Sequence, residues 1–256
     1  MRIALLIQYD GSNYHGWQVQ PDPLTIQGFI EQALGIVFEG SCGLVGSGRT
    51  DSGVHALGQV AHFDIESTPI PIQNIWKVLN RQLPDDIRVI NSCEVADDFH
   101  SRFQAVKREY QYTIGLQQQV LHRNSRWLVR YPLDRNKLHQ VSELIVGEHD
   151  FSSFCYAGTE TENMICNIVE ATWAESADTS FIFQVKADRF LHHMVRMLVG
   201  SMIEVSRAKW DLQHFADLLN RPDRQAQVVT APANGLALMR VHYPVNSQPV
   251  WEHSRS

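Results

Sequence analysis

The chain has 256 residues, of which 44% are apolar, and its 28 acidic and 22 basic side chains leave a net charge of −6. This apolar content excludes an intrinsically disordered chain, and the acidic balance counts against a nucleic-acid partner, because binding phosphates needs clustered positive charge. The four cysteines form no CxxC pair and the first residues show no signal-peptide pattern. The sequence therefore predicts a reduced, cytoplasmic protein without a disulfide framework.

The first half of the chain alternates between apolar patterns of period 2 and period 3.6. Predicted strands cover residues 2–9, 41–45, 58–65 and 87–95, and predicted helices cover residues 25–38 and 71–82. Thr25 is the expected N-cap of the first helix, because its hydroxyl can accept from the unpaired N–H groups of the first turn. The predicted order is β-α-β-β-α-β.

The second half repeats this order loosely. Predicted strands cover residues 108–114, 163–174, 180–188 and 235–243, and predicted helices cover residues 134–146, 190–206 and 210–219. Asp134 is the expected N-cap of the first of these helices, and Gly147 is expected to end it.

The two βαββαβ-like halves predict an α+β fold. We expect the halves to be related by a pseudo-twofold axis and to form a mixed or antiparallel sheet, with helices on one side and a central active-site cleft. The expected boundaries are residues 1–103 for the N-terminal half and 104–245 for the C-terminal half. Residues 246–256 are polar and are expected to form a flexible tail.

Charge is unevenly distributed along the chain. Residues 100–137 carry eight basic and two acidic side chains, a net charge of +6, whereas residues 138–188 carry a net charge of −8. The aromatic residues within the basic segment are Tyr110, Tyr112, Trp127 and Tyr131. Basic and aromatic side chains together suit an RNA surface, although a solvated strand-and-loop face is equally compatible. We expect the acidic segment to face elsewhere.

The densest cluster of reactive side chains is Gly-Ser-Gly-Arg-Thr-Asp-Ser-Gly-Val-His-Ala, residues 46–56, between two predicted strands. It places Arg49, Asp51 and His55 within seven residues, beside glycines that let the backbone approach a ligand. From the residue types alone, an ordinary turn with Asp51 in an Asx turn is the simpler interpretation.

Other chemical interpretations are disfavoured. Asp51, His55 and His62 match no compact metal-ligand motif, so no metal site is expected. His192 and His193 are adjacent on a predicted helix and point in different directions, so they are interpreted as core or cleft histidines. The glycine cluster lacks the Gly-Lys-Ser/Thr ending of a P-loop, which argues against a nucleoside triphosphatase.

Five sequence blocks nevertheless resemble the tRNA pseudouridine synthase A family. They are residues 9–18, 48–56, 97–103 with 107–112, 190–196 with 199–200, and 235–238. The blocks stand in family order and span residues 3–243. Two positions depart from the family pattern. Ser52 stands where Ala is common, and Glu109 interrupts a more basic run, although on a strand it would face away from Tyr110.

The resemblance implies an isomerase that converts uridine to pseudouridine in the anticodon stem-loop of tRNA, at tRNA positions 38, 39 and 40. The C1′–N1 glycosidic bond is broken, the uracil is turned, and a C1′–C5 bond is formed. No cofactor and no metal are implied, because the reaction is an isomerisation. The resemblance also implies a homodimer with tRNA lying across both subunits.

Individual residues take roles from the same resemblance. Asp51 would be the catalytic carboxylate, which attacks C6 of the uracil or C1′ of the ribose, the latter with an elimination variant. Arg196 would keep Asp51 ionised, provided that the two halves meet at the cleft. Tyr110 would stack on the target base and take or relay the C5 proton. Arg49 would fill the space left when the uridine leaves its stack.

Several further residues are expected to support this site. The expected RNA contacts beyond the target base are Arg102, Lys107 and Arg108. His55 is expected to order the loop, and Tyr14 and Trp17 are expected to brace the first turn rather than to contact RNA. Two alternatives stay open. One is a non-catalytic RNA-binding module of paired RRM-like halves, and the other is a metal-dependent nucleotide hydrolase using Asp51 and His55.

Overall fold

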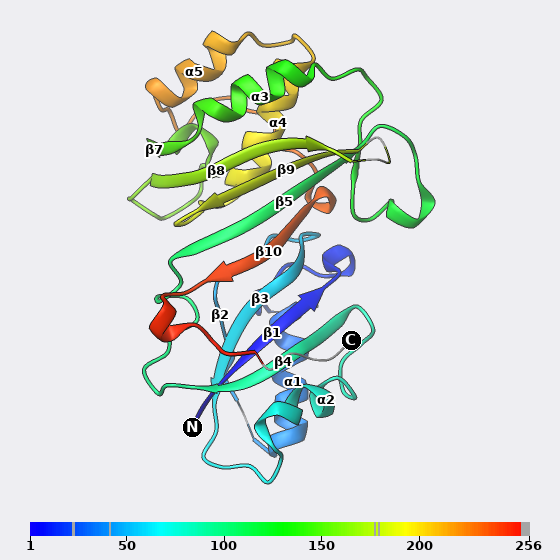
Figure 1. The fold of residues 1–256 in the computed structure, drawn as a ribbon, viewed down its shortest axis with the longest axis vertical. Coiled ribbons are helices and arrows are strands. Elements are labelled where there is room, and N and C mark those ends of the chain that lie inside the picture. The colour runs from blue at the N-terminus through cyan, green and yellow to red at the C-terminus, as the bar shows by residue number, and fades with distance from the viewer. Residues whose placement is uncertain (22–23, 41, 177, 179, 252–256) are drawn as a thin grey trace. The chain divides into compact units, whose positions relative to one another are not determined.

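The computed structural model describes residues 1–21, 24–40, 42–176, 178 and 180–251, which divide into two compact units. The first unit is Met1–Val106 together with the chain from Leu238 onward, and the second is Lys107–Ala237. The expected boundaries, 1–103 and 104–245, group the last strand with the second half, whereas the structure places it in the first unit from Leu238. Helices and strands alternate in both units, so the predicted α+β class is confirmed (Figure 1).

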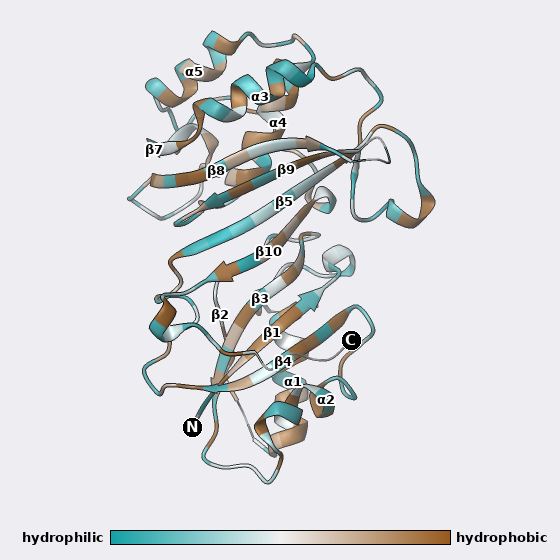
Figure 2. Ribbon diagram, in the orientation of Figure 1, coloured by the Kyte–Doolittle hydropathy of each residue, from teal (hydrophilic) through white to brown (hydrophobic). Residues whose placement is uncertain are grey.

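The first unit follows the predicted order β-α-β-β-α-β. Its elements are β1 (Arg2–Tyr9), α1 (Ile26–Phe38), β2 (Val45–Gly46), β3 (His55–Asp64), α2 (Ile75–Leu79) and β4 (Ile87–Val95). β1 pairs antiparallel with both β3 and β4, and β10 (Leu236–His242) lies beside β3. Hydrophobic residues follow these strands (Figure 2), and alternate residues of β1 are fully buried at Ile3, Leu5 and Ile7. The period-2 pattern thus forms the core of this unit.

In the second unit, the helices lie on one face of an antiparallel set of strands (Figure 1). Its elements are β5 (Lys107–Gly115), β6 (Trp127–Leu128), α3 (Arg135–Leu144), β7 (Gly147–Asp150), β8 (Ile165–Glu175), β9 (Ser180–Ala187), α4 (Met194–Ser206) and α5 (Leu212–Asn220). The strand order is β5-β9-β8-β7, and β6 adds a short parallel pairing to β5. Within the ranges that the structure describes, no helix is long and apolar enough to cross a membrane.

Both predicted N-caps are confirmed. The Thr25 hydroxyl accepts from the Gly28 N–H, and the Asp134 carboxylate accepts from the Lys137 N–H. The strand predicted at residues 41–45 is reduced to β2, which starts at Val45, and Ser41 lies outside the described residues. The helix predicted over residues 134–146 ends at Leu144, and Gly147 (φ +108°), the residue expected to end it, begins β7 instead.

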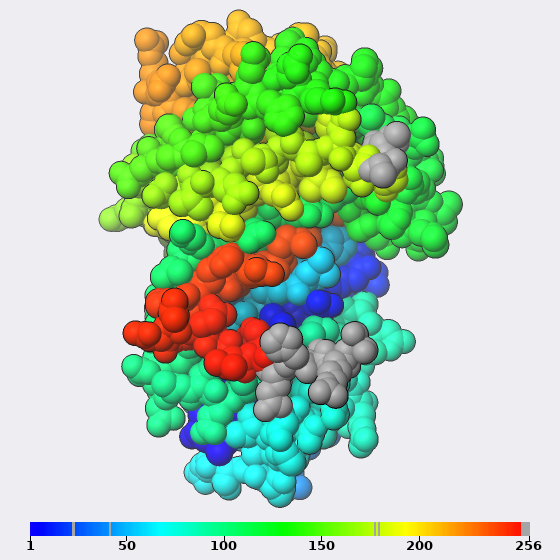
Figure 3. All heavy atoms as spheres, in the orientation of Figure 1, coloured from blue at the N-terminus to red at the C-terminus, as the bar shows by residue number. Residues whose placement is uncertain are grey.

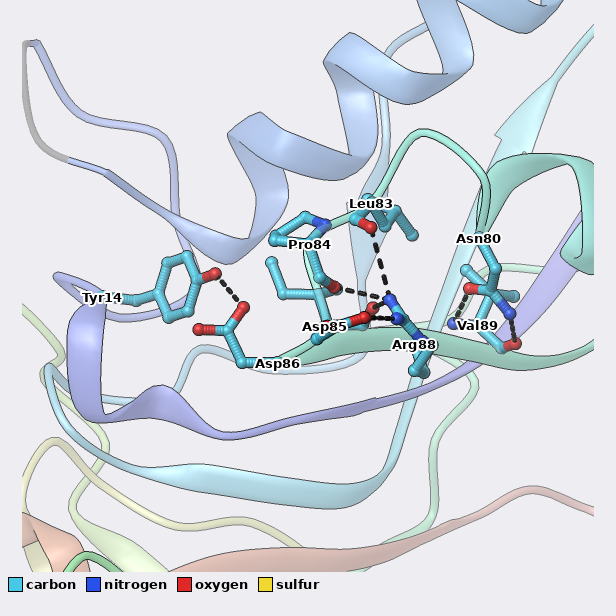
Figure 4. Close-up of polar contacts among 9 residues, drawn as sticks. Tyr14, Asn80, Leu83, Pro84, Asp85, Asp86, Arg88 and Val89 are labelled. Carbon is cyan, nitrogen blue, oxygen red and sulfur yellow. Dashed lines mark hydrogen bonds and ion pairs between the residues drawn. The ribbon is translucent and has the colours of Figure 1, made fainter.

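The helix predicted over residues 71–82 ends early, because a side chain takes over the hydrogen bonding. A 3-10 turn (Ile72–Asn74) precedes α2, which ends at Leu79. The Asn80 amide then bonds both backbone groups of Val89 in β4, each at 2.8 Å (Figure 4). An Asn side chain that replaces a strand partner in this way stops the helix and fixes the start of β4.

The residues after β10 pack against the rest of the first unit. Pro249 is buried, and the Val250 N–H bonds the Cys93 thiol. Burial raises the pKa of Cys93 to about 12, and this hydrogen bond lowers it in part. Figure 3 shows this segment, in red, against the cyan and blue segments of the same unit. The tail predicted to be flexible is therefore held at Pro249 and Val250, and residues 252–256 lie outside the described residues.

His62 is a core histidine. It is 3% exposed in β3, and its Nδ1 lies 2.9 Å from the Ser101 hydroxyl. Burial, with a smaller contribution from the positive charge of Arg2, lowers the pKa of His62 to about 4. Because burial disfavours the imidazolium, the folded protein holds His62 neutral at pH values where the unfolded chain is protonated.

Acidification should therefore destabilise the protein through His62. Between the unfolded pKa of about 6.5 and the folded pKa of about 4, the unfolded chain binds one proton more, so the free energy of unfolding falls as the pH falls. From pH 7 to pH 5 the expected contribution is about 2 kcal/mol. Urea unfolding at both pH values measures this change in the free energy of unfolding. His62→Gln should reduce this pH dependence, whereas His122→Gln, at an exposed position, should not; equal pH dependence in all three proteins would refute the assignment.

Candidate active site

A tight turn carries Arg49 and Asp51 at the start of β3. Arg49 is exposed and Asp51 is partly buried. The Val54 N–H donates to the Asp51 carbonyl at 3.1 Å, and Gly53 has φ +78°. A turn with this conformation at its third residue favours glycine, because other side chains would clash with the backbone. The turn therefore fixes the backbone of Asp51 directly against a strand.

The chain after β1 packs against this turn. Gly16 has φ +87°, and a Cβ atom there would lie 2.6 Å from the Thr50 carbonyl oxygen. The Trp17 N–H donates to the same oxygen at 3.1 Å, and the Tyr14 carbonyl accepts from the Gly53 N–H at 3.3 Å. Residues 14–17, more than thirty residues earlier in the chain, thus hold the backbone on both sides of Asp51.

His55 joins the same two segments, which confirms its expected role in ordering the loop. Its Nδ1 atom lies 3.1 Å from the Gly11 nitrogen and 3.1 Å from a carboxylate oxygen of Asp10. Gly11 leaves no room for a side chain, because a Cβ atom would lie 2.0 Å from the Val54 carbonyl oxygen. This close backbone contact requires glycine.

Tyr14 and Trp17 brace the first turn, as predicted. Both side chains are buried, at 5% and 2% exposure. The Tyr14 hydroxyl donates to Asp86, just before β4 (Figure 4), and burial together with this carboxylate raises the pKa of Tyr14. The Trp17 ring lies where a Cβ on Gly46 would be, 2.6 Å away. Neither ring is available for RNA stacking.

The turn is also held by buried polar side chains that are not among the predicted site residues. The Ser47 hydroxyl donates to Gln59 Oε1 at 2.6 Å, and the Gln59 amide donates to the Gly48 carbonyl at 3.1 Å. The hydroxyls of Tyr9 and Thr50 lie 2.8 Å apart. The sequence signal for these residues is weak, because a polar residue within a strand pattern is usually taken as solvent-facing.

In the second unit, Tyr110 lies in β5 opposite Val185 of β9. Its ring is 9% exposed and meets Phe190 edge to face, with ring centres 5.1 Å apart. Tyr112 is fully buried and donates to the Pro232 carbonyl at 2.8 Å, so it is a core residue. Tyr110 is thus the less buried of the two tyrosines.

Arg196 lies in the first turn of α4 and is partly buried. Its Nε donates to the Ala231 carbonyl at 2.9 Å, and the Ala231 N–H returns a bond to the Arg196 carbonyl at 3.0 Å. Burial raises the pKa of Tyr112, and the positive charge of Arg196 opposes this rise. Arg196 is therefore held beside the buried end of Tyr112. The helix predicted from residue 190 begins only at Met194, because His193 has φ +64°.

The N-terminal part of β5 is the hydrophilic end of this strand (Figure 2). Lys107 is exposed, and Arg108 donates to the Asp188 carbonyl at 3.0 Å. Glu109 stands opposite Lys186 in β9, 3.7 Å from its amine, on the face away from Tyr110 as predicted. The third expected RNA contact is exposed in the first unit, where the Arg102 guanidinium lies 5.9 Å from the Phe103 ring.

The acidic segment is expected from the sequence to face away from the basic segment. This expectation is wrong at two places, where ion pairs join the two segments. Arg126 bonds Asp178 at 2.6 Å, and Arg135 bonds Glu175, with 2.7 Å between Nε and Oε1. The Arg126 guanidinium and a Ser180 hydrogen bond lower the pKa of Asp178 to about 2. Two basic residues of the +6 segment are therefore paired with carboxylates, because β8 packs against α3 and the start of β9 pairs with the end of β5.

The predicted residues divide between the units. The first unit holds Arg49, Asp51 and Arg102, and the second holds Lys107, Arg108, Tyr110 and Arg196.

Comparison with known proteins identifies the family. A family model described as tRNA pseudouridine synthase matches residues 5–104 and 141–244. tRNA pseudouridine synthase A of Exiguobacterium sibiricum is 41% identical over 249 residues, covering 97% of this chain and 99% of that protein. The Bacillus subtilis protein of the same name is 39% identical, covering 95% and 99%. The chain belongs to the tRNA pseudouridine synthase family.

A tRNA pseudouridine synthase is an isomerase, so the enzyme converts uridine to pseudouridine in tRNA. The Bacteroides fragilis tRNA pseudouridine synthase A is also similar, at 37% identity over 95% of this chain and 96% of that protein. Among solved structures, a chain of the archaeal box H/ACA sRNP Nop10-Cbf5 complex has a TM-score of 0.39 and 9% identity, covering 92% of this chain and 47% of that chain.

The family match covers some of the predicted site and leaves out the rest. Arg49, Asp51 and Arg196 lie within the matched segments of this tRNA pseudouridine synthase. Tyr110 lies in the interval 105–140 between those segments, as do Lys107 and Arg108.

Proposed function

We propose that this enzyme isomerises uridines in the anticodon stem-loop of tRNA, with Asp51 as the catalytic carboxylate. The observation that carries the proposal is the fixed position of Asp51, partly buried in a turn whose neighbours are anchored on both sides. A carboxylate in such a position can attack the ribose C1′ or the uracil C6 without first paying the entropy of ordering its loop.

Tyr110 supplies the group that the second half of the reaction needs. Once the C1′–N1 bond is broken, the uracil must turn so that C5 bonds to C1′; C5 then loses its proton, and N1 gains one. The Tyr110 ring is supported edge to face by Phe190, and a supported aromatic ring is a stacking surface for a detached base. Its hydroxyl takes or relays the C5 proton.

Two arginines complete the proposed site. Arg196 is held by its Nε bond to Ala231, and it supplies a fixed positive charge to the reaction. Arg49, exposed two residues before Asp51, occupies the space vacated by the extruded uridine. In this proposal two copies of the chain, acting in the cytoplasm, bind one tRNA across both subunits.

Mapping of pseudouridine tests this proposal directly. A tRNA transcript is incubated with the purified enzyme, digested, and read by mass spectrometry after a reagent that labels pseudouridine. Pseudouridine confined to the anticodon stem-loop supports the proposal. Pseudouridine only in other stems would contradict the proposed substrate site while leaving the isomerase activity intact. Sedimentation of the enzyme with and without tRNA tests the dimer.

Neutralising the charges at the start of β5 should weaken tRNA binding. For the double variant Lys107→Gln/Arg108→Gln we expect roughly a tenfold loss of affinity at moderate salt and a salt dependence whose slope is smaller by about one to two. Each phosphate contact releases counterions, so losing contacts flattens the salt dependence. Filter binding across a salt series measures both quantities.

Lys77→Gln is the matched control, because Lys77 is a cation of the first unit that lies over the Trp76 ring. Its affinity and salt slope should equal those of the parent enzyme. If the double variant bound tRNA as tightly as this control at every salt concentration, Lys107 and Arg108 would not be RNA contacts.

A further inference from the structure

The hydroxyls of Tyr9 and Thr50 form a buried polar pair that joins the end of β1 to the Asp51 turn. Their oxygens lie 2.8 Å apart, and the two side chains are 4% and 6% exposed. Earlier in β1, Ile3, Leu5 and Ile7 are fully buried and apolar, whereas Tyr9 at the end of the strand is buried with a polar atom.

A buried hydroxyl is costly unless it is bonded, so this pair needs an explanation beyond volume. Phe and Val would fill the same space with no polar atom to satisfy. A directional hydrogen bond, unlike apolar packing, fixes one orientation of the two groups that it joins. The pair therefore serves to set an orientation rather than to fill the core.

The group that this bond orients is the residue directly before Asp51. Thr50 is β-branched, so its hydroxyl position is tightly coupled to its backbone. Its carbonyl oxygen accepts from the Trp17 N–H at 3.1 Å, so Thr50 is held through its side chain and its backbone at once. The peptide bond between Thr50 and Asp51 is thereby fixed at one end.

The other end of the turn is held separately. Ser47, 1% exposed, bonds Gln59 at 2.6 Å, and Gln59 bonds the Gly48 carbonyl at 3.1 Å. Arg49 lies between this anchor and Thr50. The two anchors thus divide the turn, and the Tyr9–Thr50 bond is the one adjoining the carboxylate.

We infer that Tyr9 and Thr50 are positioning residues for the isomerisation, acting through the backbone of Asp51. The inference rests on the proposed role of Asp51 as the catalytic carboxylate. Displacing a reacting group by a fraction of an ångström slows the chemical step more than it weakens substrate binding, because binding uses many other contacts. The bond between the two hydroxyls should therefore affect kcat and leave tRNA affinity nearly unchanged.

Tyr9→Phe and Thr50→Val each remove one hydroxyl while keeping the buried volume. We expect each variant to lose at least about tenfold in the single-turnover rate at saturating enzyme, with tRNA affinity changed less than about twofold. Thr50→Ser retains the hydroxyl and should recover most of the rate. The double variant Tyr9→Phe/Thr50→Val should be no slower than the slower single variant, because both changes remove the same bond.

Tyr243→Phe is the matched control. It removes a buried tyrosine hydroxyl of the same unit, which donates to the Ser101 carbonyl at 2.7 Å, at a site away from the Asp51 turn. Its melting temperature should fall about as much as that of Tyr9→Phe, with kcat unchanged. A kcat for Tyr9→Phe within twofold of the parent, losses that multiply in the double variant, or an equal loss of kcat in Tyr243→Phe would each overturn the inference.

Asp51→Ala separates this inference from the function on which it rests. If Asp51→Ala is inactive while Tyr9→Phe and Thr50→Val keep the full rate, the proposed catalytic carboxylate stands and the positioning pair is refuted. If Asp51→Ala retains full activity, the catalytic assignment itself fails, and the positioning role fails with it.

Discussion

Replacing Asp51 with alanine is expected to lower the rate of pseudouridine formation by a factor on the order of 10³ or more, while tRNA affinity changes little. The substitution removes the proposed catalytic carboxylate, and alanine leaves the backbone of the turn intact. A loss confined to catalysis is expected because a small, partly buried carboxylate contributes little to holding a polyanion. Single-turnover assays and filter binding measure the two effects.

Asp64→Asn is the appropriate control, because Asp64 is an exposed carboxylate of the same unit, paired with Arg2 at 2.8 Å. Exposed ion pairs contribute little, so its rate and stability should remain close to those of the parent enzyme. Measurable turnover by Asp51→Ala at more than a tenth of the parent rate would remove Asp51 from the mechanism. A parallel collapse of tRNA affinity would show that the residue acts in binding instead.

Replacing Gly11 with alanine should damage both stability and activity. The added methyl would lie 2.0 Å from the Val54 carbonyl oxygen and 2.7 Å from its carbon, distances that no relaxed packing allows. The clash involves backbone, so the turn after β1 and the turn that carries Asp51 must separate. We expect a loss of about 3 kcal/mol in the free energy of unfolding and at least about a hundredfold loss of kcat.

Urea unfolding and single-turnover kinetics measure this prediction. Gly43→Ala is the control, because a Cβ at that exposed glycine meets no atom within 4 Å. Its stability should stay within about 0.5 kcal/mol of the parent enzyme. If Gly11→Ala folded with parental stability and turned over at the parental rate, the contact between the two turns would not constrain Asp51.

Much of the first unit could be read from apolar periodicity. β1 and β4 have the predicted bounds, because their residues alternate or are continuously apolar and are flanked by turn residues. The caps at Thr25 and Asp134 could also be predicted, because a capping side chain bonds its own helix and needs no distant partner. Local chemistry is sufficient wherever the partners lie within a few residues of each other.

Elements whose limits depend on distant partners could not be predicted. α2 stops where Asn80 bonds Val89, nine residues away on β4, and α4 begins late because His193 takes a left-handed conformation. The short strand β7 exists only because β8 pairs with it. In each case the deciding interaction is tertiary and leaves no periodic signal in the sequence.

The charge of the chain is likewise predictable only in part from the sequence. The sequence predicts a basic segment with a net charge of +6, and Lys107 at the start of β5 is exposed as an RNA contact requires. The sequence cannot reveal that two other arginines of this segment are paired with carboxylates, because each partner lies 40 or more residues further along the chain. These pairs are Arg126 with Asp178 and Arg135 with Glu175. Only the sheet order brings them together.

By itself, the sequence determined the family, the α+β class and the segment that carries Arg49 and Asp51, because these follow from residue identity and local periodicity. The tertiary structure decided how Asp51 is held. Gly11 and Tyr9, about forty residues earlier in the chain, contact the turn only after β1 and β3 have paired. A directional bond between buried groups exists only in the folded chain, so no sequence pattern announces it.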